Sequence, residues 1–280
     1  MLSRQELVRG KIMPELPEVE TVLRTLESRI ASLEITGITV RWPGVITGDI
    51  EEFCSRLMHQ HFNGFMRRGK YLLFVMDDCI LESHLRMEGK YYIQRPDEPL
   101  QKHAHICFDL SDGNQLRYHD TRKFGRMRIL PLDTDLSAFH DLGPEPFDEA
   151  FSPEYIHAYR KNRNTPMKSL LLDQNFTAGI GNIYADEILF ACGIRPGRNC
   201  RRITRNDEQH LVTETRRILQ EAIAAGGTTI RSYTSSLGVT GLFQLDCMVH
   251  TMKTCKVCGS EIKVKRIGGR SSYYCPVCQK

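Results

Sequence analysis

Residues 13–21 read Met-Pro-Glu-Leu-Pro-Glu-Val-Glu-Thr, and the chain after them continues with helical periodicity. The apolar residues of this stretch lie three or four positions apart: Val19, Val22, Leu23, Leu26 and Ile30. This spacing places them on one face of an α-helix, and Pro14 and Pro17 suit a helix entrance. We therefore predict an amphipathic helix over residues 18–30 that holds Pro14 and Glu15 at a fixed place over the rest of the domain.

Residues 35–131 are predicted to form strands, because short β-branched and aromatic runs alternate there with Gly and Asp turns. The predicted strands span residues 35–40, 71–76, 79–83, 91–94, 105–110, 115–118 and 126–130. Short strands joined by tight turns are typical of an antiparallel β-sandwich. We expect this sandwich to end at the linker Leu142-Gly143-Pro144-Glu145-Pro146.

Helical periodicity returns beyond the linker. Helices are predicted over residues 167–173, 183–191 and 204–225, with a tight Gly179-Ile180-Gly181-Asn182 turn between the first two. Thr204 and Asp207 have the spacing of a helix cap, and Gly226-Gly227 should end the long helix. Residues 228–243 are rich in Gly, Ser and Thr and are predicted to form a flexible loop.

Four cysteines near the end of the chain have the spacing of a zinc site: Cys255, Cys258, Cys275 and Cys278. Each Cys-x-x-Cys pair turns two thiolates toward one metal ion, and the two pairs complete a tetrahedron. Gly268-Gly269 suits the two-residue turn of a β-hairpin, so Arg270 should lie at its exposed tip. Because four thiolates leave no open position, we expect one structural Zn2+, without which the module should unfold.

The positive charge of the chain is concentrated in this zinc module. The formal net charge is +4, but residues 248–280 alone hold seven basic residues and one acid. A basic module of this kind indicates a polyanionic partner. The other cysteines are scattered and should be reduced thiols, and no apolar run approaches the roughly 18 residues of a membrane helix. We therefore expect a cytoplasmic protein without a membrane partner.

Several short motifs carry side chains with useful chemistry. They are Pro14-Glu15, Arg67-Arg68-Gly69-Lys70-Tyr71, His84-Leu85-Arg86-Met87-Glu88-Gly89, Tyr118-His119-Asp120-Thr121-Arg122-Lys123-Phe124-Gly125 and Thr177-Ala178-Gly179-Ile180-Gly181-Asn182-Ile183-Tyr184-Ala185-Asp186-Glu187. Taken singly, the Pro-Glu pair is better explained as a first helix turn, the basic motif as a solubilising surface turn, and Met87 and Phe124 as core residues. Their joint order, followed by the zinc module, resembles the formamidopyrimidine-DNA glycosylase family, also called 8-oxoguanine DNA glycosylases, from Met13 to Lys280.

The resemblance implies a bifunctional base-excision-repair enzyme, a DNA glycosylase with abasic-site lyase activity. In the family the amine of an N-terminal proline, matched here by Pro14, attacks C1′ of the damaged nucleotide, expels the base and forms a Schiff base. Glu15 and Lys70 would move protons through base loss and β-elimination, and Arg270 would assist δ-elimination. The implied substrates are 8-oxoguanine and formamidopyrimidines in damaged double-stranded DNA, bound by a monomer that associates with the nucleoid.

The resemblance also implies an α+β fold in four parts and a set of DNA contacts. Residues 1–12 are an extension, 13–145 a catalytic β-sandwich domain with its amphipathic helix, 146–245 a helix–two-turn–helix DNA-binding domain and 246–280 a β-hairpin zinc finger. Met87, Arg122 and Phe124 match the family's triad that fills the void left by a flipped base, a role that suits apolar wedges and an arginine. The remaining matched DNA contacts are His103, Asn164, Lys168 and Asn182.

The sequence departs from the family pattern at two places. The family usually has a basic residue where Asn164 stands, although Arg163 is adjacent. The stretch before the zinc ligands, residues 249–254, is shorter than the usual lead-in. The first departure weakens or displaces one contact, and the second could change how the finger joins the helices.

The twelve residues before Met13 bear directly on the chemistry. A proline nitrogen joined to a preceding residue is an amide whose lone pair is delocalised, so it cannot act as a nucleophile. We expect Met13 to be the true start, or residues 1–12 to be a removable leader. If they remain, the alternative is a non-catalytic protein that binds lesions or abasic sites.

A second alternative concerns the substrate. The sister subfamily, endonuclease VIII, prefers oxidised pyrimidines to oxidised purines. Leu16, the Met-Arg-Phe triad and the long loop over residues 228–243 resemble the purine branch. We therefore predict oxidised purines as the substrate.

Overall fold

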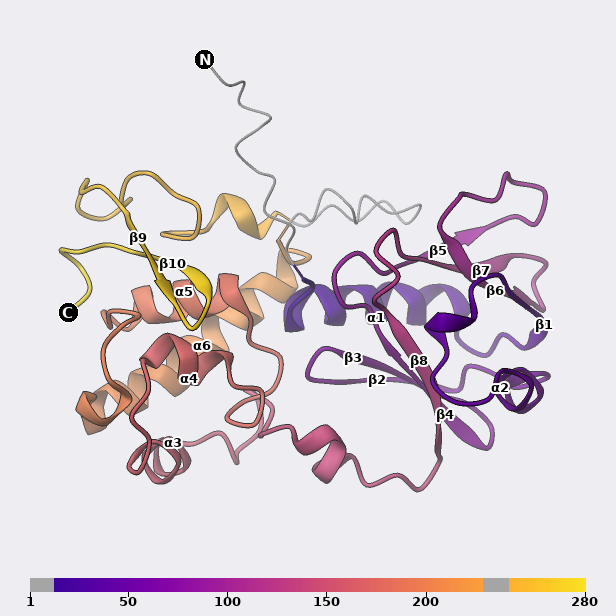
Figure 1. Ribbon diagram of the computed structural model, residues 1–280, viewed down its shortest axis with the longest axis horizontal. Helices are drawn as coiled ribbons and strands as arrows, with labels where there is room; N and C mark the ends of the chain where they lie inside the picture. Colours follow the sequence, from indigo (N-terminus) through magenta and orange to yellow (C-terminus); the bar gives the residue numbers. More distant parts are fainter. Residues whose placement is uncertain (1–12, 229–241) are drawn as a thin grey trace, which may run out of the picture.

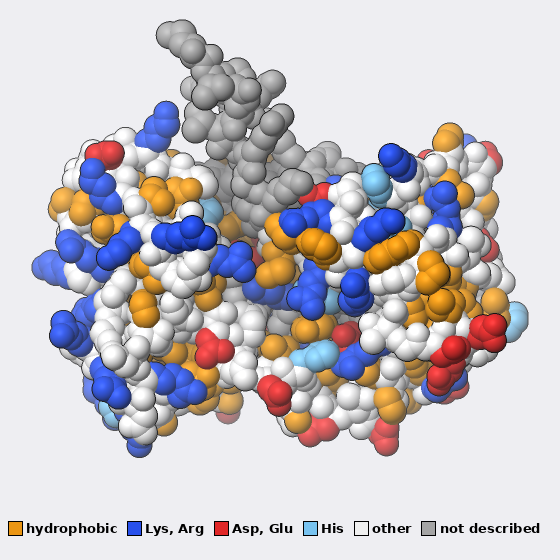
Figure 2. Space-filling model, in the orientation of Figure 1, with side chains coloured by type: hydrophobic (Ala, Val, Ile, Leu, Met, Phe, Trp, Pro, Cys, Tyr) orange, Lys and Arg blue, Asp and Glu red, His pale blue; other side chains and the backbone are white. Residues whose placement is uncertain are grey.

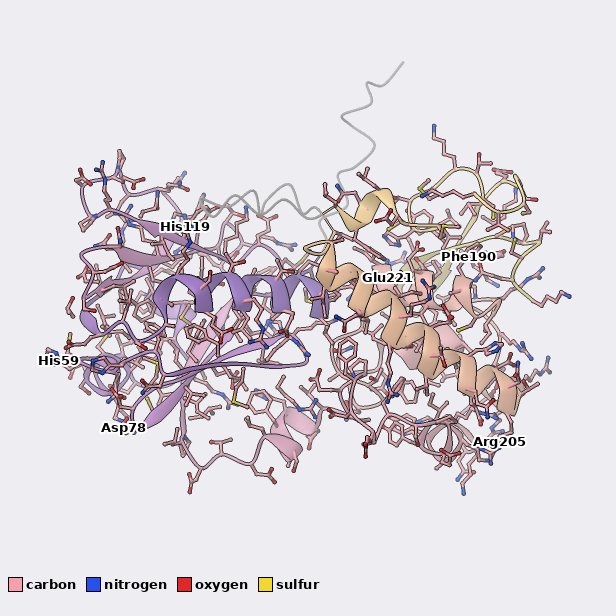
Figure 3. The ribbon with its side chains drawn as sticks, turned by 180° about the vertical axis from the view of Figure 1, so that it is seen from behind. His59, Asp78, His119, Phe190, Arg205 and Glu221 are labelled. Carbon is pink, nitrogen blue, oxygen red and sulfur yellow. The ribbon has the colours of Figure 1, made fainter. Side chains whose placement is uncertain are left out.

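The computed structural model describes residues 13–228 and 242–280. It has two lobes, a β-sheet lobe that carries α1 (Leu16–Ile30) and a helical lobe that carries the β9–β10 hairpin (Figure 1). The long helices α1 and α6 (Arg205–Ala224) run toward each other and meet at the junction of the lobes (Figure 3). The amino-terminal turn of α1 therefore lies between the lobes.

The β-sheet lobe is a sandwich of two four-stranded antiparallel sheets, which confirms the expected fold class. One sheet has the order β1 (Ile35–Val40), β6 (Ala104–Leu110), β7 (Gln115–His119) and β5 (Lys90–Gln94). The other has the order β2 (Gly64–Arg68), β3 (Tyr71–Val75), β4 (Cys79–His84) and β8 (Arg126–Pro131). All seven predicted strands are confirmed to within one or two residues at their ends.

The core of the sandwich is closed by the apolar face of α1. Leu23, Leu26 and Ile30 are fully buried and share one core with Phe74 of β3 and Phe108 of β6. Each buried side chain of this size stabilises the fold by about 1.5–3 kcal/mol. Leu16, at the start of α1, belongs instead to the core of the helical lobe. The predicted helix is therefore confirmed, and its first turn is packed against the other lobe.

Three elements were not predicted. Strand β2 contains Arg67 and Arg68, and the turn that follows it begins at Gly69. Helix α2 (Ile50–Leu57) and helix α3 (Pro153–Arg160) are each eight residues long. Helices this short carry too few apolar residues to show a clear period, and their caps, Asp49 and Ser152, are the better signal.

The helical lobe is formed by α3, α4 (Met167–Leu172), α5 (Asn182–Ala191) and α6, with the short 3-10 turns η3 (Cys200–Arg202) and η4 (Phe243–Leu245) in its core. Two further 3-10 turns, η1 (Pro43–Val45) and η2 (Leu136–Asp141), precede it in the chain. The capping box of Thr204 and Asp207 is present, as predicted. Most of the predicted loop over residues 228–243 lies outside the described residues. None of the described helices has the length and apolar character that crossing a membrane requires.

The β9 (Lys263–Ile267) and β10 (Arg270–Tyr274) strands form the predicted hairpin. Gly268 and Gly269 both have positive φ, 55° and 77°, as a two-residue hairpin turn with the twist of its strands requires. Arg270 follows the turn and is exposed. Asn182 Nδ2 donates to the carbonyl of Ser271 at 3.1 Å, so the hairpin lies against the start of α5.

Candidate active site and nucleic-acid interface

Glu15 lies where the amino-terminal turns of two helices meet. It precedes α1, and its carboxylate accepts from the backbone N–H of Ile183 at 2.9 Å and of Tyr184 at 3.4 Å, at the start of α5. The positive end of a helix dipole stabilises such a carboxylate. Leu16 N–H donates to the Gly179 carbonyl at 3.0 Å, which fixes the same junction. Glu15 is only 2% exposed. Its backbone lies at the start of α1, and its carboxylate is held by the N–H groups of α5 in the other lobe.

The glycine turn before α5 makes room for Glu15. A Cβ on Gly181 would lie 2.2 Å from Cδ and 2.5 Å from Oε1 of Glu15. A Cβ on Gly179 would lie 2.7 Å from Leu16, and Gly179 has a φ of +89°. The tight turn predicted before α5 therefore admits the first turn of α1.

Lys70 reaches the same junction from the turn between β2 and β3. Its Nζ donates to the Ile180 carbonyl at 3.0 Å, and the residue is 7% exposed. Burial lowers the pKa of Lys70, while Glu15 and Glu18 oppose that shift and Arg270 adds to it. The structure thus brings together four residues that are far apart in the sequence, Glu15, Glu18, Lys70 and Arg270.

A buried ion-pair network holds the β2–β3 turn against the linker. Arg67 pairs with Glu20 at 2.8 Å and with Glu145 at 2.6 Å, and Arg68 pairs with Glu145 at 3.1 Å. The backbone N–H of Gly69 also donates to Glu145, at 2.6 Å. Because the turn is anchored on both sides, the position of Lys70 is set by the linker between the lobes.

Glu18 is a site residue that sequence reasoning missed. Its buried carboxylate accepts from Glu15 N–H at 2.9 Å, from the Tyr184 hydroxyl at 2.6 Å and from Thr228, through N–H at 2.8 Å and Oγ1 at 2.9 Å. Burial, with Glu15 nearby, raises the pKa of Glu18. The available signal was the position of Glu18 three residues after Glu15, where a capping carboxylate is common.

The predicted void-filling triad is assembled at the surface of the β-sheet lobe. Phe124 is 48% exposed, and the guanidinium carbon of Arg122 lies 4.6 Å from its ring centroid. Nη1 of Arg122 also approaches Sδ of Met87, from the loop after β4. An exposed phenylalanine and a half-buried methionine held beside an arginine suit insertion into a base stack.

Asp120 is a second residue that sequence reasoning missed. It is 1% exposed, and its carboxylate accepts from the backbone N–H of Arg122, Phe124 and Gly125 at 2.8–2.9 Å. It therefore shapes the loop that presents two members of the triad. A carboxylate inside a loop motif was visible in the sequence, but its partners depend on the path of the backbone.

The other predicted DNA contacts lie in different environments. His103 is half-buried, with its ring 6.4 Å from that of His105, and Asn164 is exposed, with its Oδ1 bound to Nδ2 of Asn199. Lys168 does not occupy the surface position that a direct phosphate contact requires, because it is 0% exposed and pairs with Asp186. Asn182 lies at the start of α5, where its Oδ1 has no hydrogen-bond partner among the described residues.

The four cysteine ligands form a cluster that fits zinc. The sulfur atoms of Cys255, Cys258, Cys275 and Cys278 all lie within 4.8 Å of one another. Two of the separations are 3.8 Å and 3.4 Å. Tetrahedral Zn–S bonds of about 2.3 Å place sulfur atoms about 3.8 Å apart, so the geometry suits one zinc ion with four thiolate ligands. Such a site is structural because no coordination position stays open.

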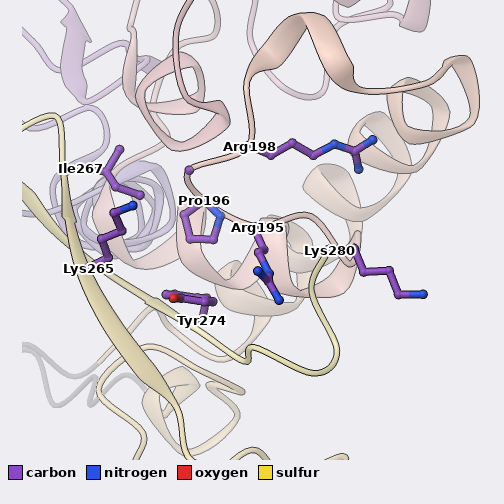
Figure 4. Close-up of a pocket in the computed structure, with 8 residues that line it drawn as sticks. Arg195, Pro196, Arg198, Lys265, Ile267, Tyr274 and Lys280 are labelled. Atoms are coloured by element: carbon purple, nitrogen blue, oxygen red, sulfur yellow. The ribbon is translucent and has the colours of Figure 1, made fainter.

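The face that contains the junction of the lobes is rich in cations. Lysine and arginine side chains gather there on both lobes, and acidic side chains lie mostly along the lower edge (Figure 2). A separate hollow of about 340 Å³ lies between the hairpin and the loop after α5, and its lining includes Arg195, Lys265 and Tyr274 (Figure 4). None of the candidate catalytic residues lines this hollow.

Three family models match the chain in succession. Residues 13–127 match the formamidopyrimidine-DNA glycosylase N-terminal domain. Residues 142–234 match the formamidopyrimidine-DNA glycosylase H2TH domain. Residues 253–280 match the zinc finger found in FPG and IleRS.

Similar proteins match over nearly the whole chain. The formamidopyrimidine-DNA glycosylase of Bacillus licheniformis is 45% identical over 274 residues, covering 96% of this chain and 100% of that protein. The enzyme of the same name from Oceanobacillus iheyensis is 42% identical, covering 95% of this chain and 98% of that protein.

Solved structures of similar proteins also match over nearly the whole chain. The complex of Lactococcus lactis Fpg with an abasic site containing DNA has a TM-score of 0.90 and 39% identity, covering 95% of this chain and 99% of that one. The complex of wild-type Lactococcus lactis Fpg with a DNA containing N7-benzyl-Fapy-dG has a TM-score of 0.89 and 39% identity, covering 95% and 100%.

Proposed function

The chain belongs to the formamidopyrimidine-DNA glycosylase family, and we propose that it removes 8-oxoguanine and formamidopyrimidines from duplex DNA and then cleaves the strand. One observation carries the assignment of residues. Pro14 and Glu15, at the start of α1, lie at the junction of the lobes where Lys70 and the start of α5 also arrive. This convergence supports a single reaction centre built from both lobes.

We propose the amine of Pro14 as the nucleophile. An α-amine has a pKa of about 8, so roughly a tenth of it is unprotonated at neutral pH. Its lone pair would form a bond to C1′ while the bond from C1′ to the damaged base breaks, and the base would leave with a proton. Opening of the sugar ring then gives a Schiff base between Pro14 and C1′. In this sequence Met13 precedes Pro14, so the active form would begin at Pro14.

Glu15 and Lys70 are the proposed proton-transfer groups. The carboxyl of Glu15 is adjacent to the Pro14 nitrogen along the chain and could donate a proton to the ring oxygen as the sugar opens. Burial lowers the pKa of Lys70, so it can exchange a proton more readily near neutral pH than an exposed lysine can. Loss of the 3′ phosphate by β-elimination, and of the 5′ phosphate by δ-elimination with Arg270, would leave a one-nucleotide gap.

Base recognition is proposed for the Met87, Arg122 and Phe124 triad. The target base must leave the duplex before C1′ can be reached, and the gap in the stack must be filled. The contacts of Arg122 with both Met87 and Phe124 support a triad that acts as one wedge. We propose that Asn182, Asn164 and His103 also contact the DNA.

The test is borohydride trapping on an 8-oxoguanine duplex, with the chain that starts at Met1 compared with the form that starts at Pro14. Each protein's intact mass must be measured first. We expect a covalent adduct only with the Pro14 form, and Glu15→Gln should lose base excision. An adduct formed by a chain that verifiably retains residues 1–12 would refute Pro14 as the nucleophile. A thymine glycol duplex tests the substrate, because preferential excision of that base would refute the choice of oxidised purines.

A second candidate function is a non-catalytic lesion-binding protein. The observation that favours it is the stretch of twelve residues before Met13, because the Pro14 nitrogen stays an amide if these residues persist. Tight binding to an abasic-site duplex, with no trapped adduct from either form, would support this candidate over the enzyme.

We also propose that the protein acts as a monomer in the cytoplasm, on the nucleoid. The match to a DNA-bound relative supports association with DNA, and the scattered cysteines, which form no disulfide among the described residues, suit a reducing compartment. Sedimentation analysis with and without a lesion duplex would test the oligomeric state.

A further inference from the structure

Helix α5 holds the first residues of the zinc-finger segment through an unusual set of hydrogen bonds. The carboxylate of Glu187, 4% exposed, accepts from the backbone N–H groups of Met248, Val249 and His250 at 2.7, 3.0 and 2.8 Å. Three consecutive amides therefore converge on one side chain. Hydrogen bonds to a charged acceptor are about twice as strong as neutral ones, so this segment has a fixed position on the helix.

The neighbouring acid, Asp186, makes a second connection to the same segment. Its Oδ2 contacts Nδ1 of His250 at 2.8 Å, and its Oδ1 pairs with Nζ of Lys168. Lys168 Nζ also donates to the Asn182 carbonyl at 3.0 Å. Asp186 and Lys168 are both 0% exposed, and the His250 side chain is 8% exposed. A buried chain of polar contacts therefore runs from α4 through α5 to the finger.

His250 also contacts the hairpin that carries Arg270. Its ring lies 4.9 Å from the ring of Tyr273, edge to face, and Tyr273 is on β10 three residues after Arg270. At the tip, a Cβ on Gly268 would lie 3.0 Å from Oγ of Ser169, so the turn lies close to α4. The position of Arg270 therefore depends on contacts at the base and at the tip of the finger.

Other contacts hold the end of the chain without reaching Arg270. Arg195 donates to the carbonyls of Gln279 at 2.8 Å and Pro276 at 2.7 Å (Figure 4). These bonds hold the second pair of zinc ligands beside the loop after α5. The orientation of β10 depends on the contacts of His250, Asn182 and Ser169 and on the apolar cluster that Tyr273 shares with Phe190 of α5.

We propose that His250 is a positioning residue: through Asp186 and Lys168 it seats the zinc finger on α4 and α5 so that Arg270 faces the Glu15–Lys70 site. Lys168 then serves this network in place of a direct phosphate contact. The proposal rests on the proposed function for its kinetic part, because Arg270 is assigned there to δ-elimination. A displacement of about 1 Å in such a group can cost about 100-fold in rate.

The test uses three variants of His250 and one control. His250→Phe keeps a ring against Tyr273 but cannot bond Asp186. His250→Asn keeps a nitrogen close to where Nδ1 lies, whereas the longer side chain of His250→Gln places its nitrogen elsewhere. His210→Phe is the control, because His210 is an exposed histidine on α6.

The readouts are zinc content, hydrogen exchange over residues 263–274, and the ratio of β-elimination to β,δ-elimination product. We expect full zinc content in all variants, faster exchange in His250→Phe and His250→Gln, and a ratio raised about 10- to 100-fold in these two. His210→Phe should behave as the wild type, and His250→Asn, which keeps a nitrogen for Asp186 but loses the ring contact with Tyr273, should be less affected than His250→Gln. If His250→Phe loses zinc, the proposal is tested by comparing hydrogen exchange and product ratio between His250→Gln and His250→Asn.

Unchanged exchange and an unchanged product ratio in His250→Phe and His250→Gln would overturn the proposal. The same would follow if His250→Asn were as impaired as His250→Gln. If the wild-type protein cleaves no DNA, whether it begins at Met1 or at Pro14, the proposed function fails. Hydrogen exchange of the hairpin still tests the seating of the finger in that case.

Discussion

Replacing Gly181 by alanine should displace the Glu15 carboxylate without straining the backbone. Gly181 has φ −128° and ψ −158°, an extended conformation that alanine adopts freely. The new methyl group, however, would lie 2.2 Å from Cδ of Glu15. Because that atom belongs to the carboxyl group, the carboxylate must move away from the Ile183 N–H that it accepts from at 2.9 Å.

The expected loss of stability follows from these two contacts. Overpacking in a close-packed site costs about 1–3 kcal/mol, and a hydrogen bond to a charged group contributes about 1.5–3 kcal/mol. Replacing glycine by alanine returns about 0.4–1 kcal/mol by restricting the unfolded chain. We expect Gly181→Ala to be destabilised by about 2–5 kcal/mol, and base excision to fall about 100-fold or more because a proton-transfer group is misplaced.

Denaturant unfolding and single-turnover excision of 8-oxoguanine by the Pro14-ended protein measure the two effects. Gly197→Ala is the matched control, because its Cβ would have only an ordinary contact, 3.7 Å from Ile267 Cδ1, and no positive φ. The control should keep full activity and equal or greater stability. A Gly181→Ala protein with wild-type stability and excision rate would refute the close approach of α1 to the turn as the feature that places Glu15.

Three further predictions concern the metal, the linker and pH. Chelation of zinc should speed hydrogen exchange over residues 253–280, because the small core of the zinc module depends on the metal. It should also weaken binding to an abasic-site duplex, which fluorescence anisotropy measures. Glu145→Gln should lower the free energy of unfolding by about 1.5–3 kcal/mol, because Arg68 loses its carboxylate partner while Arg67 keeps Glu20. Glu221→Gln, at a 54% exposed side chain, should change it by less than about 1 kcal/mol. Burial lowers the pKa of Lys70 below its ordinary 10.5, so the folded protein releases that proton at lower pH than the unfolded chain and gains stability as pH rises through this range. The free energy of unfolding of the wild type and of Lys70→Met should be measured up to pH 10.5. The value for the wild type should rise relative to that of the variant as the pH rises. A difference that stays constant would contradict the lowered pKa of Lys70.

Elements with a long, regular pattern were predictable from the sequence. Helix α1 has an apolar face over its whole length, and the strands of the sandwich are bounded by turn residues, so local sequence and tertiary packing favour the same structure. Strand β2 was missed because Arg67 and Arg68 have a low preference for strands. They are stable there because Glu20 and Glu145, from distant parts of the chain, neutralise them.

Residues of the candidate site were predictable only when their role follows from their own chemistry. Pro14, Glu15 and Lys70 were suggested by motif and type, whereas Glu18 and Asp120 act by collecting backbone N–H groups. A carboxylate in such a role resembles any surface acid in the sequence. Its donors are identified only when the chain has folded.

The sequence by itself determined the zinc ligands, seven of the sandwich strands and the amphipathic helix, because cysteine spacing and apolar periodicity are local properties. Only the tertiary structure decided that Lys168 is buried against Asp186 and that Gly181 admits Glu15. It also decided that Arg270, across the junction of the lobes, helps to lower the pKa of Lys70. The physical reason is that charge pairing and close approach depend on distances in space, and these distances are fixed only when the two lobes and the finger have packed together.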